Sequence, residues 1–249
     1  MNGPFKKYVF IAAAILASVV FTDRLQAADT DASPDRMAAG YALYDKGAYK
    51  QAAAEFTKVI EANPLSYTAF YNRGLCRREL DDFKAAVSDF SKAIMLRPTE
   101  AGAFRNRGRA YAELKFYDKA IEDFTEAISL ENNDALAYIY RGDAYYSAGI
   151  YGYAARDYSA AIAVRPDDDS LYLRRAEAYR RDKQFEEAVA DYTKGLELSP
   201  VNAADTADVY LVRGGAYLSL GRSGLAGADF KKACELGNKD GCARAKRFK

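Results

Sequence analysis

The side chains that most often carry out catalysis or hold metals are missing or scattered in this sequence. It contains no histidine, the commonest general base near neutral pH and the commonest metal ligand. Three cysteines are too few for a zinc site built from four nitrogen or sulfur ligands. No G-x-x-x-x-G-K-[ST] phosphate loop or G-x-S-x-G nucleophile motif occurs. We therefore expect no catalytic residues, no bound metal and no cofactor, and we interpret the chain as a non-enzyme.

Arginine and aspartate instead recur in pairs. Five arginines are each followed sixteen residues later by an aspartate: Arg73 and Asp89, Arg107 and Asp123, Arg141 and Asp157, Arg175 and Asp191, and Arg213 and Asp229. If each pair spans the turn of a helical hairpin, its two side chains lie level with each other. Breaking a buried ion pair costs about 3–5 kcal/mol, whereas an exposed pair contributes about 0–1 kcal/mol. We interpret these pairs as structural contacts that fix helix register, not as ligand-binding charges.

Small and aromatic residues mark the elements that must position these pairs, with a period of 34 residues. Glycine or alanine recurs at Gly40, Gly74, Gly108, Gly142, Ala176 and Gly214; alanine follows at Ala52, Ala86, Ala120, Ala154, Ala188 and Ala226; and an aromatic residue follows at Phe56, Phe90, Phe124, Tyr158, Tyr192 and Phe230. Each repeat carries two apolar stripes at helical spacing, separated by a break near its fifteenth residue. In an antiparallel hairpin with this turn, position 8 should face position 20, so that glycine against alanine lets the helices approach closely.

This period and its small–small–aromatic punctuation resemble the tetratricopeptide repeat, a two-helix unit that stacks into a solenoid. The resemblance implies an all-α fold, a right-handed superhelical solenoid of six antiparallel helix hairpins over residues 33–240. The repeats begin at Ser33, Tyr67, Ala101, Ala135, Asp169 and Ala207, with a four-residue insertion near 202–206 before the last. Residues 241–249 should form a short capping helix, since solenoid ends need specialised caps.

The amino terminus has the order of a secretory signal peptide. Lys6 and Lys7 precede a mostly apolar run over 8–21, and a polar segment then leads to Ala27 and Ala28. The run is shorter than the roughly 20 residues that span a bilayer. We predict a signal peptide at 1–27, a short linker at 28–32 and a periplasmic or secreted protein. Asp23 and Arg24 are unusual in such a region, so an uncleaved membrane anchor is the alternative.

The three cysteines have different predicted roles. Cys76 stands where the other repeats carry alanine, which indicates a small buried side chain. The segment from Cys234 to Cys242 looks like that of Sel1-like, cysteine-rich exported repeat proteins, whose paired cysteines link adjacent helices. The resemblance implies a Cys234–Cys242 disulfide, which an oxidising compartment permits and which would add about 2–3 kcal/mol. The alternative is two buried thiols.

The resemblance also implies where a partner binds. In tetratricopeptide proteins the face formed by positions 2, 6, 9 and 13 of the first helix lines a concave groove for extended peptides or partner helices. This face points away from position 4 and hence from the core. The candidate peptide-binding residues here are Asn72, Asn106, Arg109, Tyr140 and Arg174. Asparagine can bond peptide backbone in both directions, and arginine and tyrosine supply contacts that often dominate interfaces. Ordinary solvated helix surface is the alternative interpretation.

The leading hypothesis is therefore a non-catalytic exported adaptor or scaffold that binds a protein or extended peptide in its concave groove. The net charge of +1 predicts no general attraction to nucleic acid, and a membrane is involved only if the amino-terminal segment is uncleaved. The alternative is an inner-membrane-anchored structural subunit of an envelope assembly or secretion complex, which would use its convex face and basic tail.

Overall fold

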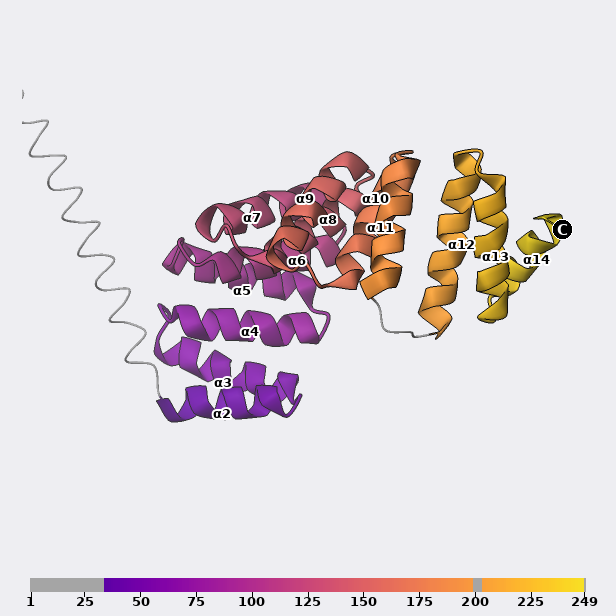
Figure 1. Cartoon of the computed structure of the whole chain (residues 1–249). Helices are drawn as coiled ribbons and strands as arrows, with labels where there is room; N and C mark the ends of the chain where they lie inside the picture. The colour runs from indigo at the N-terminus through magenta and orange to yellow at the C-terminus, as the bar shows by residue number, and fades with distance from the viewer. Residues whose placement is uncertain (1–33, 199–202, 249) are drawn as a thin grey trace, which may run out of the picture. The chain divides into compact units, whose positions relative to one another are not determined.

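The computed structural model describes residues 34–198 and 203–248, and all of the regular structure in these ranges is helical (Figure 1). The chain divides into two compact units, with the boundary between residues 130 and 131. Unit one contains the hairpins α2 (Pro34–Asp45) with α3 (Tyr49–Ala62), α4 (Tyr67–Glu79) with α5 (Phe83–Leu96), and α6 (Ala101–Glu113) with α7 (Tyr117–Leu130). Unit two contains α8 (Ala135–Ser147) with α9 (Tyr151–Val164), α10 (Asp169–Arg181) with α11 (Phe185–Leu198), α12 (Ala203–Ser219) with α13 (Ser223–Glu235), then α14 (Lys239–Ala245) and the 3-10 helix η2 (Lys246–Phe248).

The predicted all-α fold of helical hairpins is confirmed. The final helix begins at Lys239, two residues before the predicted start of the cap, because Asn238 caps it by accepting a hydrogen bond from the Gly241 amide. The predicted signal peptide and linker lie outside the described residues, as does the start of the predicted insertion.

Each hairpin turns at repeat position 15, where the backbone is left-handed in every repeat. The residues at this position are Gly47, Asp81, Lys115, Gly149, Lys183 and Gly221, with φ between 58° and 79°. A left-handed residue just after a helix lets its amide bond back to the preceding turn, and glycine adopts this conformation without a steric cost. Three of the six turns therefore carry a side chain where glycine is preferred. The sequence pattern had placed a break near position 15 of each repeat but had not indicated its left-handed conformation.

Within a hairpin, glycine at position 8 lies directly against the aromatic ring at position 24. A Cβ added to Gly74 would lie 2.8 Å from the Phe90 ring, and the same contact recurs in the other hairpins that carry glycine at position 8. The expectation that position 8 faces the alanine at position 20 did not include this contact with the ring. Helical side chains lean toward the amino terminus of their helix, so a ring at position 24 covers the surface one turn earlier. In the fifth repeat Ala176 takes this place and clusters with both Ala188 and Tyr192.

The five predicted arginine–aspartate pairs are all present as two-pronged ion pairs across their hairpins. Arg175 is representative: its Nε lies 2.6 Å from Asp191 Oδ2 and its Nη2 lies 2.8 Å from Asp191 Oδ1. The five aspartates are nearly excluded from solvent, with 2–7% of their surface exposed. Each of these arginines also lies over the aromatic ring at position 4 of its own repeat. The prediction that these pairs are structural is confirmed.

The same arginines also connect neighbouring repeats, which the sequence pattern had not indicated. Arg175 Nη1 donates to Ser159 Oγ at 2.9 Å, and Ser159 belongs to the preceding hairpin. Equivalent bonds join Arg73 to Thr57, Arg107 to Ser91 and Arg213 to Thr193. In every case the acceptor is the hydroxyl at position 25 of the preceding repeat. These four arginines thus hold their own hairpins together and link them to the hairpins before.

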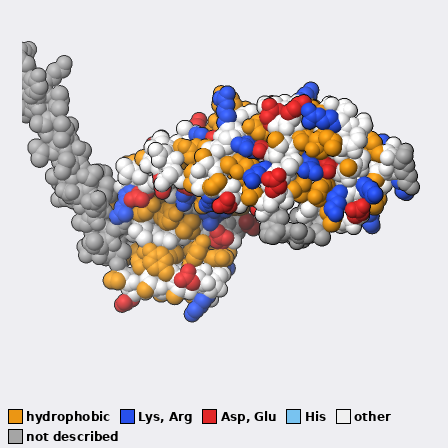
Figure 2. All heavy atoms as spheres, in the orientation of Figure 1, with side chains coloured by type: hydrophobic (Ala, Val, Ile, Leu, Met, Phe, Trp, Pro, Cys, Tyr) orange, Lys and Arg blue, Asp and Glu red, His pale blue; other side chains and the backbone are white. Residues whose placement is uncertain are grey.

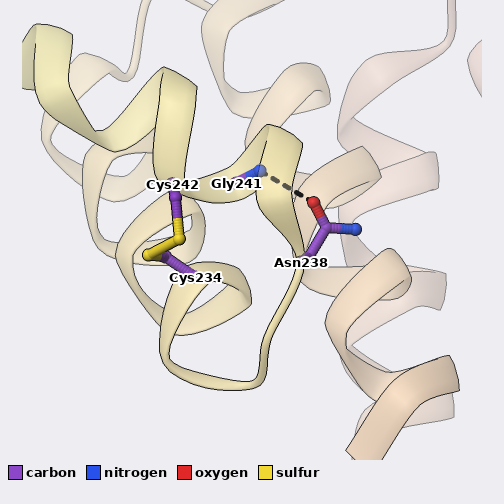
Figure 3. The surroundings of a disulfide bond; sticks show 4 residues. All are labelled: Cys234, Asn238, Gly241 and Cys242. Atoms are coloured by element: carbon purple, nitrogen blue, oxygen red, sulfur yellow. Dashed lines mark hydrogen bonds between the residues drawn. A yellow bond between two sulfur atoms is a disulfide. The ribbon is translucent and has the colours of Figure 1, made fainter.

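The carboxy-terminal helix is fastened to α13 by a disulfide and by tight packing (Figure 3). Cys234 and Cys242 are bonded, with their Cα atoms 4.4 Å apart. Gly241 lies so close to α13 that an added Cβ would be 2.7 Å from the Ala233 Cβ. Phe248 covers Gly227, and its ring lies 5.7 Å from that of Phe230. The tail is therefore a packed cap over the last hairpin. Cys76, in contrast, is a buried free thiol, as expected.

Candidate peptide-binding surface

Positions 6 and 9 of the first helix in repeats two to five define what we call the first-helix strip. In unit one the strip consists of Asn72, Leu75, Asn106 and Arg109, and in unit two it consists of Tyr140, Asp143, Arg174 and Glu177. On the face shown in Figure 2, acidic and basic side chains are intermixed over the described surface.

The two asparagines of unit one are occupied by contacts inside the protein. Asn106 Nδ2 donates to the Gly102 carbonyl at 2.8 Å and to the Tyr71 hydroxyl at 2.9 Å, and its Oδ1 accepts from Arg78. Asn106 is consequently only 6% exposed. Asn72 makes the same kind of contact, donating to the Thr68 carbonyl at 2.7 Å. These amides therefore bind neighbouring side chains and their own helix, and Asn106 offers almost no surface to a peptide.

Arg109 lies at a small polar pocket of unit one. The pocket has a volume of about 210 Å³ and is lined by Arg78, Glu79, Asp81, Phe83, Arg109 and Glu113. Its lining is mostly charged, with Phe83 as its one aromatic wall. Such a site can exchange hydrogen bonds and ion pairs with a ligand but buries little apolar surface.

Tyr140 in unit two is half-buried and packs against the core cluster of Ile139, Ala161 and Leu171. The sequence placed position 6 away from the core of its own hairpin, which is correct for one hairpin in isolation. However, the cluster against which Tyr140 packs includes Leu171 from α10 of the next repeat. Tyr140 therefore contributes to folding as well as to the strip. A substitution at Arg174 tests binding with less effect on folding.

Arg174 is the most accessible of the predicted binding residues and borders an open, mostly apolar pocket. The pocket has a volume of about 330 Å³ and is lined by Asp143, Tyr146, Tyr158, Leu173, Arg174 and Glu177. We call it the α8–α10 pocket. The Arg174 side chain is 48% exposed, and its Nη1 lies 2.6 Å from Asp143 Oδ1. The guanidinium thus stands at the rim with one N–H engaged and much of its surface facing solvent.

Two buried tyrosines hold the carboxylates of this pocket. Tyr158 donates to Asp143 at 2.8 Å, and Tyr192 donates to Glu177 at 3.0 Å. Burial, together with the neighbouring carboxylate, raises the pKa of each tyrosine, so both hydroxyls stay protonated and keep donating. Asp143 and Glu177 are therefore each held in place by a hydrogen bond from a buried tyrosine on the second helix of the same hairpin.

Glu177 has its hydrogen-bonding capacity filled within the protein. It accepts two bonds from Arg180 at 2.6 and 2.7 Å, one from Arg181 at 3.0 Å, and one each from Tyr146 and Tyr192. Burial alone would raise the pKa of Glu177, but the bonds from the two arginines outweigh it and lower the pKa to about 2. Glu177 is therefore a structural anion that holds its arginines at the edge of the pocket.

The sequence pattern had assigned position 9, where Asp143 and Glu177 stand, to the binding face, but it had not indicated the pocket. A readable signal was nevertheless present. The repeats with tyrosine at position 24, containing Tyr158 and Tyr192, are the ones with a carboxylate at position 9. The repeats with phenylalanine at position 24 carry Tyr41, Leu75, Arg109 and Gly215 at position 9. Tyrosine at position 24 therefore occurs together with the carboxylate at position 9 that accepts its hydrogen bond.

Within residues 34–198 and 203–248, no helix is both long and apolar enough to cross a membrane. Over the same part of the chain, no three histidine, cysteine or acidic side chains come together in a way that could hold a metal ion.

Stacked antiparallel hairpins, each closed by a small residue against a ring, define an all-helical repeat protein. Models of the tetratricopeptide repeat match residues 37–105 and 141–203, 108–149 and 207–239. The chain belongs to the tetratricopeptide repeat family. No curated protein sequence matches it.

Several solved structures are similar. One is MamA, with a TM-score of 0.62 and 26% identity, covering 64% of this chain and 93% of MamA. Another is YrrB, described as a TPR protein with an unusual peptide-binding site, with a TM-score of 0.68 and 19% identity over 77% of this chain and 97% of YrrB. A third is the C-terminal part of a TPR repeat-containing protein from Cytophaga hutchinsonii, with a TM-score of 0.73 and 21% identity over 85% of each chain. The last two show likeness of fold alone.

Proposed function

We propose that the protein is a non-catalytic scaffold that binds a partner protein, through an extended segment, along the unit-two part of the first-helix strip. The observation that carries this proposal is the α8–α10 pocket, which combines apolar walls with the exposed Arg174 at its rim. Protein interfaces commonly depend on a few such anchors, in which an apolar recess lies next to arginine or tyrosine. The family supports the proposal, as does the peptide-binding site that is attributed to YrrB.

We further propose that the protein works outside the cytoplasm, in the periplasm or as a secreted protein. Support comes from the order of Lys6, Lys7, the apolar run and Ala27 in the sequence, and from the bonded pair Cys234–Cys242, which an oxidising compartment favours. Mass measurement on the exported protein should give a mass lacking the first 27 or 28 residues. Retention of Met1 would favour the membrane-anchored structural subunit instead.

Partner binding is tested by a pair of variants with opposite expectations. Arg174→Ala should weaken partner capture by about 1–2 kcal/mol or more, because it removes an exposed anchor at the pocket rim. The control replaces Lys246 and Arg247 by serine, which removes the basic charges of the tail while Phe248 keeps its contact with Gly227.

Scaffolding through the strip predicts loss of capture in the first variant and none in the control. The reverse pattern would contradict it and support assembly through the basic tail. Both chains should first show unchanged helicity and melting temperature, so that the comparison reports binding.

A further inference from the structure

The α8–α10 pocket has a chemistry specific enough to define its occupant. We propose that it receives one large apolar side chain of the partner's extended segment, and that a carboxylate close to this side chain contacts the arginines at the rim. The inference rests on the proposed function and deepens it by naming the class of segment that is bound.

The apolar part of the proposal follows from the walls of the pocket. Tyr146 from α8, Tyr158 from α9 and Leu173 from α10 line it, and the side chain of Tyr158 is almost wholly withdrawn from solvent. The Tyr158 hydroxyl is already bonded to Asp143, so it adds no free polar group to the wall of the pocket. At about 330 Å³ the pocket lies at the small end of the range for ligand sites. It therefore suits a single large aliphatic or aromatic side chain.

The acidic preference follows from the charges that surround the pocket. Asp143 and Glu177 are opposed by Arg174, Arg180 and Arg181, which leaves one positive charge in excess. Glu177 is filled by its five hydrogen bonds, so it has no capacity for a lysine or arginine from a ligand. The two arginines at the outside, Arg174 and Arg181, are 48% and 51% exposed and keep N–H groups for an incoming acceptor. A carboxylate matches these exposed N–H groups.

Asp143 can in addition order the backbone of the segment. One of its oxygens, Oδ1, accepts both from Tyr158 and from Arg174. The neighbouring acceptor and donor on Asp143 and Arg174 form a pair that can meet the N–H and C=O of an extended peptide. Tyr158 is thus a positioning residue, because its hydroxyl fixes the carboxylate beside the pocket.

The test is a selection of random 12-residue peptides, displayed on phage, on the whole chain. Enriched peptides are then synthesised, and their affinities are measured by fluorescence anisotropy. The variants are Leu173→Ala in the apolar wall and Arg181→Ala at the charged edge. The matched control is Tyr153→Ala, an exposed tyrosine on α9 that lies outside the pocket lining. Helicity and melting temperature verify the fold of each chain.

We expect the enriched peptides to share a large apolar residue with aspartate or glutamate within about three positions. Leu173→Ala should weaken their binding about tenfold or more, the scale of a lost anchor contact. Arg181→Ala should weaken it by several-fold, and only for peptides that retain the carboxylate. Tyr153→Ala should leave it unchanged. Because Arg181 is half-exposed, its variant tests the proposal even if Leu173→Ala impairs folding.

Two results separate the possible failures. In the first, the peptides bind Arg174→Ala more weakly than the parent but bind Leu173→Ala and Arg181→Ala as tightly as the parent. This result would overturn the pocket assignment and leave binding along the strip intact. Basic or purely polar consensus peptides would also overturn it. In the second, the selection enriches peptides no more strongly on the parent chain than on Arg174→Ala. This result would overturn both the pocket assignment and the proposed function.

Discussion

Replacing Arg175 by alanine should destabilise unit two more than any exposed substitution on the same helices. The guanidinium makes two short bonds to Asp191, whose side chain is only 9% exposed, and a third to Ser159 of the preceding repeat. The change leaves a carboxylate nearly unsolvated and breaks a link between repeats. We expect a loss of about 3–5 kcal/mol in the free energy of unfolding.

The reverse substitution should cost less, and the double change should cost less than the sum. Asp191→Ala strands a guanidinium that is 19% exposed and can partly reach water, so about 2–3 kcal/mol is expected. The double variant removes both charges, and a coupling of about 2 kcal/mol should appear in the double-mutant cycle. Urea unfolding followed by far-ultraviolet circular dichroism, with m-values compared across the four chains, measures these differences.

A matched cycle on the same helix provides the control. Lys194 and Glu197 of α11 lie 3.6 Å apart, with 46% and 62% of their side chains exposed, so their coupling should stay below about 0.5 kcal/mol. If Arg175 and Asp191 couple no more strongly than this surface pair, the view that arginines hold the hairpins and repeats together is wrong.

Three further predictions follow from single positions. Lys115 has a left-handed backbone with φ of 61°, which glycine adopts without a steric cost. Lys115→Gly should therefore raise the free energy of unfolding by about 0.5–1 kcal/mol in urea melts. A loss of stability would contradict the view that this turn is strained. The pKa of Glu177 is lowered from 4.5 to about 2, so its contribution to the free energy of unfolding is present above pH 4.5 and is lost as the pH falls toward 2. Glu177→Gln should therefore flatten the dependence of stability on pH between 4.5 and 2. An unchanged slope would count against the hydrogen-bond network around Glu177. Peptide mapping without reductant should find Cys234 linked to Cys242. Cys76 should resist alkylation until the protein unfolds, because burial raises the pKa of its thiol to about 11. Alkylation of all three cysteines in the native protein would refute this.

The sequence predicted the contacts made within one hairpin, because helical period and hairpin symmetry determine them. The pairing of Arg175 with Asp191 and the burial of Cys76 are of this kind. The contact between Gly74 and the Phe90 ring was missed because it depends on the direction in which a helical side chain leans. The left-handed turn at Lys115 was missed because its residue type gives no sign of it.

Contacts between repeats were much harder to predict. Asn106 was taken as a free amide of the binding face, yet Tyr71 and Arg78 of the preceding repeat cover it. Tyr140 is likewise packed against a cluster that includes Leu171 of the following repeat. Which side chains meet there depends on the rotation from one hairpin to the next, and the pattern of a single repeat does not specify that rotation. The candidate site therefore shifted from asparagines to the pocket beside Arg174.

The central claim, binding of a partner segment along the strip of unit two, is tested most directly by photocrosslinking in cells. A photoreactive amino acid replaces Ser170 in one chain and Tyr153 in another, so that Arg174 is kept in both. Both positions are exposed, and Ser170 lies one helical turn before Arg174 on the same face of α10. Mass spectrometry then identifies the captured proteins and the crosslinked peptides. Binding along the strip predicts one reproducible partner from position 170, crosslinked within a short segment and not captured from position 153. Equal capture from both positions, or capture only from position 153, would contradict it.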